Sequence, residues 1–157
     1  MMKETKAQTK VGVGIEVLWR ALTKDLGLIL PKVVPNLVRD VQLLEGDGGL
    51  GTLMLINFGS DVTNITYQKE KIVELDEMEH RIGLKVIEGG HLNNGYASYT
   101  TIFQLSNEIG VTDQETQVDI IVIYDTETEE TDMPLQTAKS ALAFIHCLEN
   151  YLLKNYV

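Results

Sequence analysis

The sequence predicts an α+β protein in which an antiparallel sheet of seven strands packs against one long C-terminal helix. Two observations carry this prediction. Six segments rich in β-branched and aromatic residues follow one another between positions 38 and 124 without a helical pattern between them, which is typical of an antiparallel meander. The segment 135–153 then repeats apolar residues at steps of three and four, which indicates an amphipathic helix. We expect residues 1–157 to form a single domain.

The N-terminal part of the chain predicts one strand and two short helices. Residues 3–13 alternate weakly between polar and apolar side chains and end at a Gly-Val-Gly turn, so we expect a strand there. Residues 15–24 have helical spacing of their apolar side chains, and 26–34 form a second apolar segment interrupted by glycine and proline. Two short helices that meet at a bend fit these two segments best.

The remaining elements are six strands and the long helix. Each strand segment is bounded by glycine, asparagine or aspartate clusters. We expect these strands at 38–44, 52–58, 65–75, 81–87, 96–105 and 115–124. The helix predicted at 135–153 would be roughly 30 Å long, enough to cross a small domain, and Pro134 near its start fits a first helical turn.

Composition excludes several classes of function. The formal net charge of -10, from 23 acidic and 13 basic residues, opposes binding to nucleic acids and to anionic membrane surfaces. The single cysteine, Cys147, cannot form an internal disulfide, and we expect it to be a buried or half-buried thiol on the long helix. The N-terminus lacks the apolar run of a signal peptide, so we expect a cytoplasmic protein, with the nucleus also open.

Two features that could indicate cofactor chemistry are better explained as structural. The loop 45–52 contains four glycines, but a phosphate-binding loop needs a Lys-Ser/Thr pair that opens a helix, and Thr52 opens a strand. We interpret this loop as a tight turn. His80, His91 and His146 do not lie at metal-ligand spacing from one another or from other ligand residues, so we expect neither a metal nor a cofactor.

Several segments together resemble the plant pathogenesis-related class-ten family, which has the fold of the major birch pollen allergen. The resemblance runs from about residue 3 to residue 154 and is most similar to cytokinin-specific and phytohormone-binding proteins. It rests on the terminal helix and on the segments 30–35, 41–52, 67–70 and 82–90. It implies a sheet curved around the C-terminal helix, the two short helices in a V, and a large internal cavity.

The resemblance also implies which side chains face that cavity. Strand periodicity does not choose between the two faces of 67–75, because both mix charged and apolar residues. In the hormone-binding proteins the residues that match Gln68 and Glu70 point inward and bind the ligand. Fifteen further positions should line the cavity by the same comparison: Leu22, Met54, Ile56, Phe58, Ile82, Leu84, Val86, Tyr99, Thr101, Phe103, Ile120, Val122, Ala141, Phe144 and Ile145.

An alternative interpretation remains open for each of these residues. Most are apolar, so any one of them fits an ordinary packed core as well as a cavity wall. Glu70 fits solvent exposure too, because a buried carboxylate without a partner is costly; an inward Glu70 requires ligand donors, water or a raised pKa.

Two functions follow from the resemblance. The first is a non-enzymatic carrier or receptor, expected to be monomeric, for a small and largely apolar plant ligand such as a cytokinin or gibberellin. A threonine and a tyrosine that contact the ligand in cytokinin-specific proteins are replaced by Ala141 and Phe144, which changes the hydrogen-bonding groups offered. The second is an enzyme similar to norcoclaurine synthases, with Glu70 as acid or base, although Ile82 stands at the position of the catalytic lysine and Thr101 at that of the aspartate.

Overall fold

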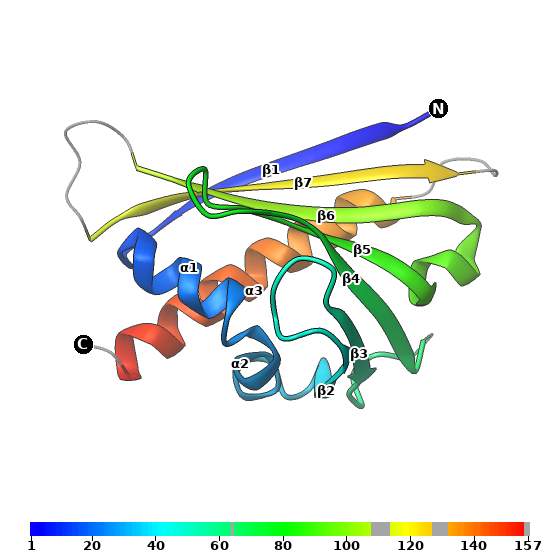
Figure 1. Ribbon diagram of the computed structural model, residues 1–157, viewed down its shortest axis with the longest axis horizontal. Helices are drawn as coiled ribbons and strands as arrows, with labels where there is room; N and C mark the ends of the chain where they lie inside the picture. The colour runs from blue at the N-terminus through cyan, green and yellow to red at the C-terminus, as the bar shows by residue number, and fades with distance from the viewer. Residues whose placement is uncertain (64, 108–113, 127–131, 156–157) are drawn as a thin grey trace.

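The computed structural model describes residues 1–63, 65–107, 114–126 and 132–155. Seven strands form one antiparallel sheet in the order β1-β7-β6-β5-β4-β3-β2, and three α-helices and one short 3-10 helix accompany it (Figure 1). In chain order the elements are β1 (Lys3–Val11), α1 (Ile15–Thr23), α2 (Leu26–Val33), β2 (Val38–Glu45), β3 (Leu53–Phe58), β4 (Tyr67–Asp76), β5 (Arg81–Gly89), η1 (Gly90–Asn94), β6 (Tyr96–Ser106), β7 (Thr116–Thr126) and α3 (Met133–Asn155).

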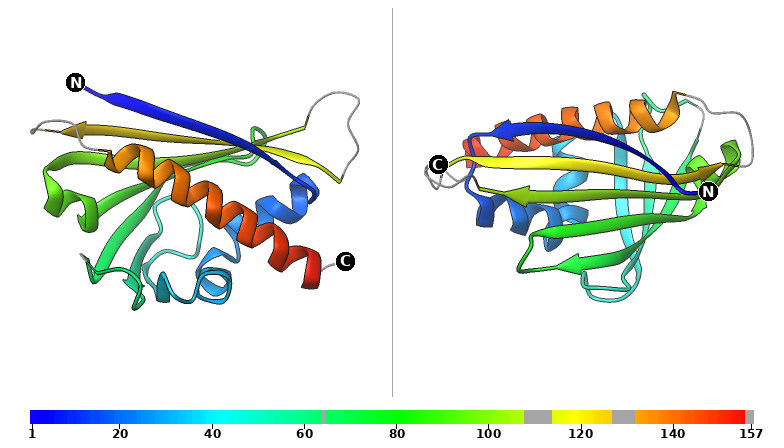
Figure 2. Two further views of the ribbon diagram at one scale, coloured as in Figure 1. Left: turned by 180° about the vertical axis from the view of Figure 1, so that it is seen from behind. Right: turned by 90° about the horizontal axis from the view of Figure 1, so that it is seen from above.

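The sheet curves around α3, which lies along its concave side (Figure 2). β1 pairs with β7, which joins the first strand of the chain to the last, and α3 packs mainly against these two strands. α1 and α2 lie near the C-terminal half of α3, and α2 also packs on β2 at the far edge of the sheet (Figure 1). The fold class predicted from the sequence is therefore confirmed.

The packed core lies where α3 meets β7. Alternate residues of β7 point inward, and the side chains of Val118, Ile120 and Val122 are fully buried. Ile145 and Leu148 from α3 are buried against this face of the sheet. Each fully buried aliphatic side chain of this size contributes about 1.5–3 kcal/mol through removal of apolar surface from water.

The boundaries of the elements agree with the predictions within about two residues, and the differences are local. The sequence pattern did not predict η1, because it is one short turn entered through Gly89 and Gly90, both with positive φ. Pro31 lies inside α2 rather than at its end. α3 begins at Met133, so Pro134 is its second residue, where no intrahelical bond needs its missing N–H.

Cys147 is exposed, so the prediction of a buried or half-buried thiol was wrong. The buried stripe of α3 runs through Ala138, Ile145, Leu148 and Leu152. Since each helical residue turns by about 100°, the position just before Leu148 and two after Ile145 faces away from that stripe. No helix in the described part of the chain is long and apolar enough to cross a membrane.

Candidate ligand-binding cavity

Between the sheet and the helices lies a cavity with two adjoining chambers. The first chamber has a volume of about 200 Å³ and lies among α1, α2 and the inner face of β3 to β6. The second chamber, of about 410 Å³, lies between β4 to β6, η1 and the N-terminal half of α3. Gln68, Glu70, Thr101, Phe58 and Phe144 border both chambers and thus mark where they meet. The two volumes suit a small organic molecule.

The structure places most of the residues predicted to face the cavity on its walls. Gln68 and Glu70 lie on the inner face of β4, opposite Ile56 and Met54 of β3. The predicted positions on the wall of the first chamber are Leu22, Met54, Ile56, Phe58, Gln68, Glu70, Ile82, Leu84, Thr101, Phe103 and Phe144. Val86, Tyr99 and Ala141 border the second chamber.

Ile120, Val122 and Ile145 line neither chamber, which corrects their predicted place on the wall. All three side chains are fully buried. Ile120 and Ile145 belong to the main apolar cluster, and Val122 packs with Ala138 in a second cluster. The reason is that α3 lies directly against β7, so no space remains between helix and strand there.

The contribution of α2, η1 and the first turns of α3 to the cavity was not predicted from the sequence. Apolar side chains of α2 and the strand after it complete the first chamber: Leu26, Leu30, Val38 and Val41. The second chamber adds Val34, Leu37, Val62, Ile65, His91, Met133, Gln136, Thr137 and Ser140. Helical spacing offered one signal, because Met133, Thr137 and Ala141 follow one another at steps of four and so share a face of α3.

Gln68 and Glu70 form a hydrogen-bonded pair at the junction of the chambers. The Gln68 Nε2 donates to Glu70 Oε1 over 2.7 Å. Gln68 is buried, whereas Glu70 lies deep in the protein with part of its surface toward the cavity. Burial raises the pKa of the Glu70 carboxyl above its usual 4.5, and the bond from Gln68 offsets this only in part. Glu70 therefore holds its proton to higher pH than a solvated glutamate does.

Gly90 makes room for this pair. A Cβ at position 90 would lie 1.8 Å from Gln68 Oε1, so any larger residue would displace the carboxamide. Gly90 has φ of 50°, a left-handed conformation that glycine adopts without strain. The Gln68 Oε1 is buried and has no hydrogen-bond partner among the described residues. Burying an acceptor without a hydrogen bond costs about 1–3 kcal/mol of folding free energy.

A second polar group lies in the second chamber around His91. Its ring stacks on Tyr99 with centroids 4.0 Å apart, and its Nδ1 lies 2.9 Å from Met133 Sδ. The Tyr99 hydroxyl lies 2.6 Å from Thr137 Oγ1 on α3. Burial lowers the pKa of His91 to about 4 and raises the pKa of Tyr99 to about 12, so both side chains are neutral at pH 7.

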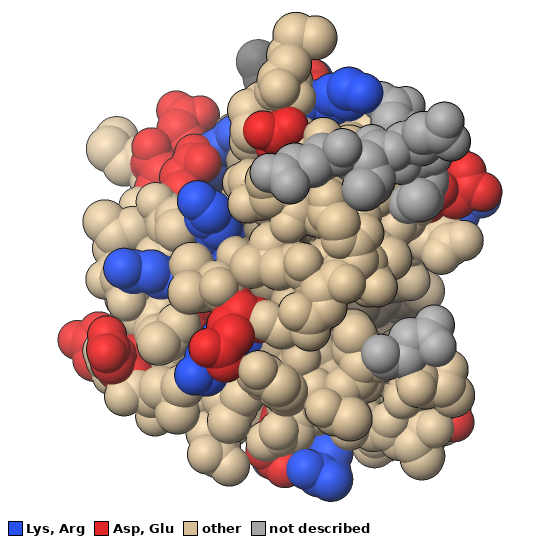
Figure 3. Space-filling view, turned by 90° about the vertical axis from the view of Figure 1, so that its right-hand side faces the viewer, with Lys and Arg blue, Asp and Glu red and all other residues tan. Residues whose placement is uncertain are grey.

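The charges of the protein lie on its surface, and neither chamber has a basic wall. Glu70, His91 and Tyr99 are the ionisable residues among the described ones that border the two chambers, and no lysine or arginine does so. On the face in Figure 3, basic and acidic side chains are interspersed around a largely uncharged middle, and no extended basic patch is visible there. The wall is thus apolar with a few placed polar groups.

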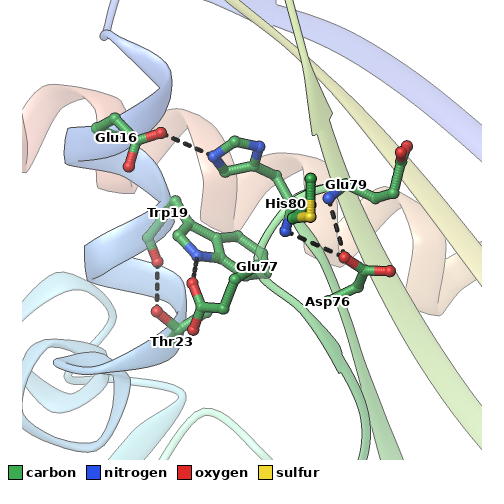
Figure 4. A network of polar contacts seen from close by, with 8 residues as sticks. Glu16, Trp19, Thr23, Asp76, Glu77, Glu79 and His80 are labelled. Atoms are coloured by element: carbon green, nitrogen blue, oxygen red, sulfur yellow. Dashed lines mark hydrogen bonds and ion pairs between the residues drawn. The ribbon is translucent and has the colours of Figure 1, made fainter.

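Another polar cluster, outside the cavity, joins α1 to the turn between β4 and β5 (Figure 4). Trp19 Nε1 donates to Glu77 Oε2 over 2.6 Å, and His80 Nε2 lies 2.8 Å from Glu16 Oε1. The rings of Trp19 and His80 meet edge to face at 5.3 Å. In the same turn, Asp76 Oδ1 accepts the backbone N–H of Glu79. These partners satisfy one another, so we assign the cluster to holding α1 on the sheet.

The glycine loop connects β2 to β3. Gly48 has φ of 102°, and its N–H donates to Thr52 Oγ1 over 2.9 Å. Backbone bonds from Gly51 N to Ile72 O and from Ile72 N to Thr52 O tie the loop to β4. The loop is thus hydrogen-bonded to β4 in addition to its chain connections to β2 and β3. Among the described residues, no group of three or more histidine, cysteine, aspartate or glutamate side chains could hold a metal ion.

Relatives of this chain include both pathogenesis-related proteins and enzymes. Pathogenesis-related protein 2 of Petroselinum crispum is 26% identical over 96% of this chain and 94% of its own length. Norbelladine synthase of Narcissus pseudonarcissus is 30% identical over 59% of this chain, and the match spans only 57% of that enzyme.

A solved structure and the family profile extend over nearly the whole chain. The structure of norcoclaurine synthase from Thalictrum flavum superposes with a TM-score of 0.82 at 20% identity, covering 99% of this chain and 88% of that one, which shows a shared fold. The profile of the pathogenesis-related protein Bet v 1 family matches residues 2–155. The chain therefore belongs to the pathogenesis-related protein Bet v 1 family.

Proposed function

We propose that this protein binds a small, largely apolar plant ligand in its internal cavity and that the ligand is a phytohormone of the cytokinin or gibberellin type. Proteins of the Bet v 1 family bind small ligands. The single observation that carries the proposal is the Gln68–Glu70 pair at the junction of two chambers whose other wall residues are mostly apolar. Apolar walls supply affinity, and a few polar groups fix the orientation of the ligand.

The rest of the proposal concerns the setting of the protein. We expect a cytoplasmic monomer that takes part in hormone signalling or plant defence and needs no cofactor. The net charge of -10 disfavours nucleic acid and anionic membranes as partners.

Isothermal titration with trans-zeatin, gibberellic acid and abscisic acid tests the proposal directly. We expect heat of binding, and a raised unfolding temperature, with at least one of them. Glu70→Gln should weaken the binding of that hormone by roughly 1–3 kcal/mol, the range for a hydrogen bond to a charged group. Absence of both heat and stabilisation with all three hormones would refute the hormone proposal.

A second candidate function is a synthase that uses Glu70 as a general acid or base. The observation that favours it is the raised pKa of Glu70, because a carboxyl that keeps its proton to higher pH than a solvated one can serve as a general acid. The relatives named norbelladine synthase and norcoclaurine synthase make an amine and an aldehyde the first substrates to test. Against it, Ile82 and Thr101 line the first chamber where the norcoclaurine synthase resemblance implies a lysine and an aspartate.

One variant separates the two functions. In a synthase, Glu70→Gln should lower turnover of dopamine with 4-hydroxyphenylacetaldehyde by about 10²-fold or more and change substrate affinity less. In a binding protein, the same variant changes affinity, and product formation stays at the rate without protein. Product measured by chromatography, alongside the titration, distinguishes these outcomes.

A further inference from the structure

The polar groups of the cavity differ in the hydrogen-bond donors and acceptors that they leave available to a ligand. Gln68 Nε2 gives one of its two hydrogens to Glu70, and the hydroxyls of Tyr99 and Thr137 use one of their two hydrogens in the bond between them. Glu70 has a second carboxylate oxygen, an acceptor, for which the structure shows no hydrogen bond among the described residues. Among the described residues, the second oxygen of Glu70 and the Oε1 of Gln68 are therefore acceptors without a partner at the junction of the chambers.

His91 adds an acceptor in the second chamber. The sulfur of Met133 has no hydrogen to give, so a hydrogen bond over 2.9 Å between it and Nδ1 of His91 requires the proton to be on Nδ1. A neutral imidazole with its proton on Nδ1 carries a lone pair on Nε2. No hydrogen bond is found for that Nε2 among the described residues, and His91 borders the second chamber together with Glu70.

The walls also lack any group that would neutralise an anion. The chambers are bordered by Glu70 but by no lysine or arginine among the described residues, and His91 is uncharged at pH 7. A ligand carboxylate buried here would meet an acidic side chain and no cation, which is strongly unfavourable. A neutral or positively charged donor meets no such obstacle.

We propose that the ligand of this cavity carries hydrogen-bond donors at two ends and no carboxylate, with an N–H group at Glu70 and a hydroxyl group at Nε2 of His91. This inference rests on the proposed function and narrows it to ligands that carry an N–H group at one end, a hydroxyl group at the other and no carboxylate, and it excludes free gibberellin acids. In this proposal His91 is a specificity-determining residue, because it raises the affinity for a ligand with a hydroxyl group over that for the same ligand without it.

The first test uses the wild-type protein and a set of matched probes. Displacement of the neutral dye N-phenyl-1-naphthylamine measures the affinity of trans-zeatin, of isopentenyladenine, which lacks the tail hydroxyl, and of the O-methyl ether of trans-zeatin. One neutral hydrogen bond predicts that trans-zeatin binds roughly fivefold more tightly than isopentenyladenine. The ether keeps the oxygen but not the hydrogen, so it should lose the advantage as well. An ether as tight as trans-zeatin would show that the hydroxyl accepts rather than donates and would overturn the assignment.

The second test uses two variants. His91→Phe keeps a flat ring for stacking on Tyr99 but removes the acceptor, so trans-zeatin and isopentenyladenine should bind it equally. Glu70→Gln is the matched control, because it should weaken both ligands and leave their ratio at about fivefold. An unchanged ratio in His91→Phe would overturn the role of His91. Since the ether comparison needs no variant, the inference stays testable if His91→Phe fails to fold.

The third test concerns charge and separates this inference from the function on which it rests. We expect gibberellic acid to displace the dye at least tenfold less well than its methyl ester at pH 7. An acid that binds as well as its ester would overturn the exclusion of carboxylates. Failure of the dye and of every probe to bind would instead refute the proposed function, whereas binding of the dye without any preference among the probes refutes this inference alone.

Discussion

The space between the sheet and α3 is packed solid beside β7 and hollow beside β3 and β4. Beside β7, Ile120 and Val122 meet Ile145 and Ala138 with no exposed surface on any of the four side chains. Beside β4, the inner positions are Gln68 and Glu70, and the chambers lie in front of them. α3 packs directly against β7, whereas the chambers lie between α3 and the inner face of β4.

We call the region beside β7 the solid half and the region beside β3 and β4 the hollow half. The solid half mainly determines the stability of the protein, and the hollow half mainly determines ligand binding. The solid half buries apolar surface, and in it the first strand of the chain, β1, pairs with the last strand, β7. The hollow half leaves a carboxyl group and an unpaired amide oxygen inside the protein, at a cost to the empty fold. Substitutions in the solid half should therefore change stability, and those in the hollow half should change binding.

The largest effect should come from two neighbouring residues of α3. Ile145→Ala removes a fully buried side chain from the solid half and should reduce the free energy of unfolding by about 2–5 kcal/mol. Phe144→Ala removes a side chain that already borders both chambers, so we expect a loss of about 1 kcal/mol and weaker binding of hydrophobic dye. Urea unfolding monitored by circular dichroism measures both. Similar losses of unfolding free energy in the two variants would contradict the assignment of stability to the solid half and of binding to the hollow half.

The sequence predicted the elements well because hydrophobic period depends only on local geometry. The seven strands and the long helix follow from periods of two and 3.6 residues, and their bounds lie within about two residues of those in the structure. For a strand with one clearly apolar face, such as β7, period also says which face points inward. Neither period nor the resemblance says how far away the opposite element lies, and so the resemblance implies a place on the cavity wall for both Ile120 and Thr101 although only Thr101 borders the cavity.

The polar part of the site was predictable only in part. The inward position of Gln68 and Glu70 came from the resemblance, because both faces of β4 mix charged and apolar residues. His91 lies on η1, where two glycines with positive φ break any period, so no pattern placed it in the cavity. The raised pKa of Glu70 depends on burial among side chains distant in sequence, which a single sequence does not report.

An effect of intermediate size should distinguish the buried carboxyl from a solvated one. Burial raises the pKa of Glu70 above 4.5, so between pH 4.5 and that raised value the folded state holds a proton that the unfolded state has lost. The stability due to this proton is fully present below pH 4.5 and is lost as pH rises through the raised pKa. Glu70→Gln removes the cost of ionising a buried carboxyl group. We expect this substitution to stabilise the empty protein by about 1–2 kcal/mol at pH 7 and by little at pH 4.

Urea unfolding at the two pH values measures this effect. Glu45→Gln at the exposed end of β2 removes the same charge from the surface and serves as the matched control, with little change expected at either pH. A gain of equal size at pH 4 and pH 7 would mean that the effect does not come from ionisation of Glu70. A loss at pH 7 would mean that the carboxylate is stabilised in the empty protein.

The smallest effect concerns the glycine loop, which belongs to the hollow half and is held by backbone conformation rather than by buried side chains. A Cβ at Gly48 would meet no atom within 4 Å, so Gly48→Ala changes only the conformational energy of a residue with φ of 102°. We expect a loss of about 1 kcal/mol. Gly27→Ala is the control, because Gly27 lies within α2 and its φ is not positive. Its Cβ would make an ordinary contact of 3.6 Å with Val41 of β2, so this substitution should cost nothing. If the loop instead binds phosphate, Gly48→Ala would abolish a measurable affinity for nucleotides while the protein remains folded, and titration of both variants with ATP decides between the two.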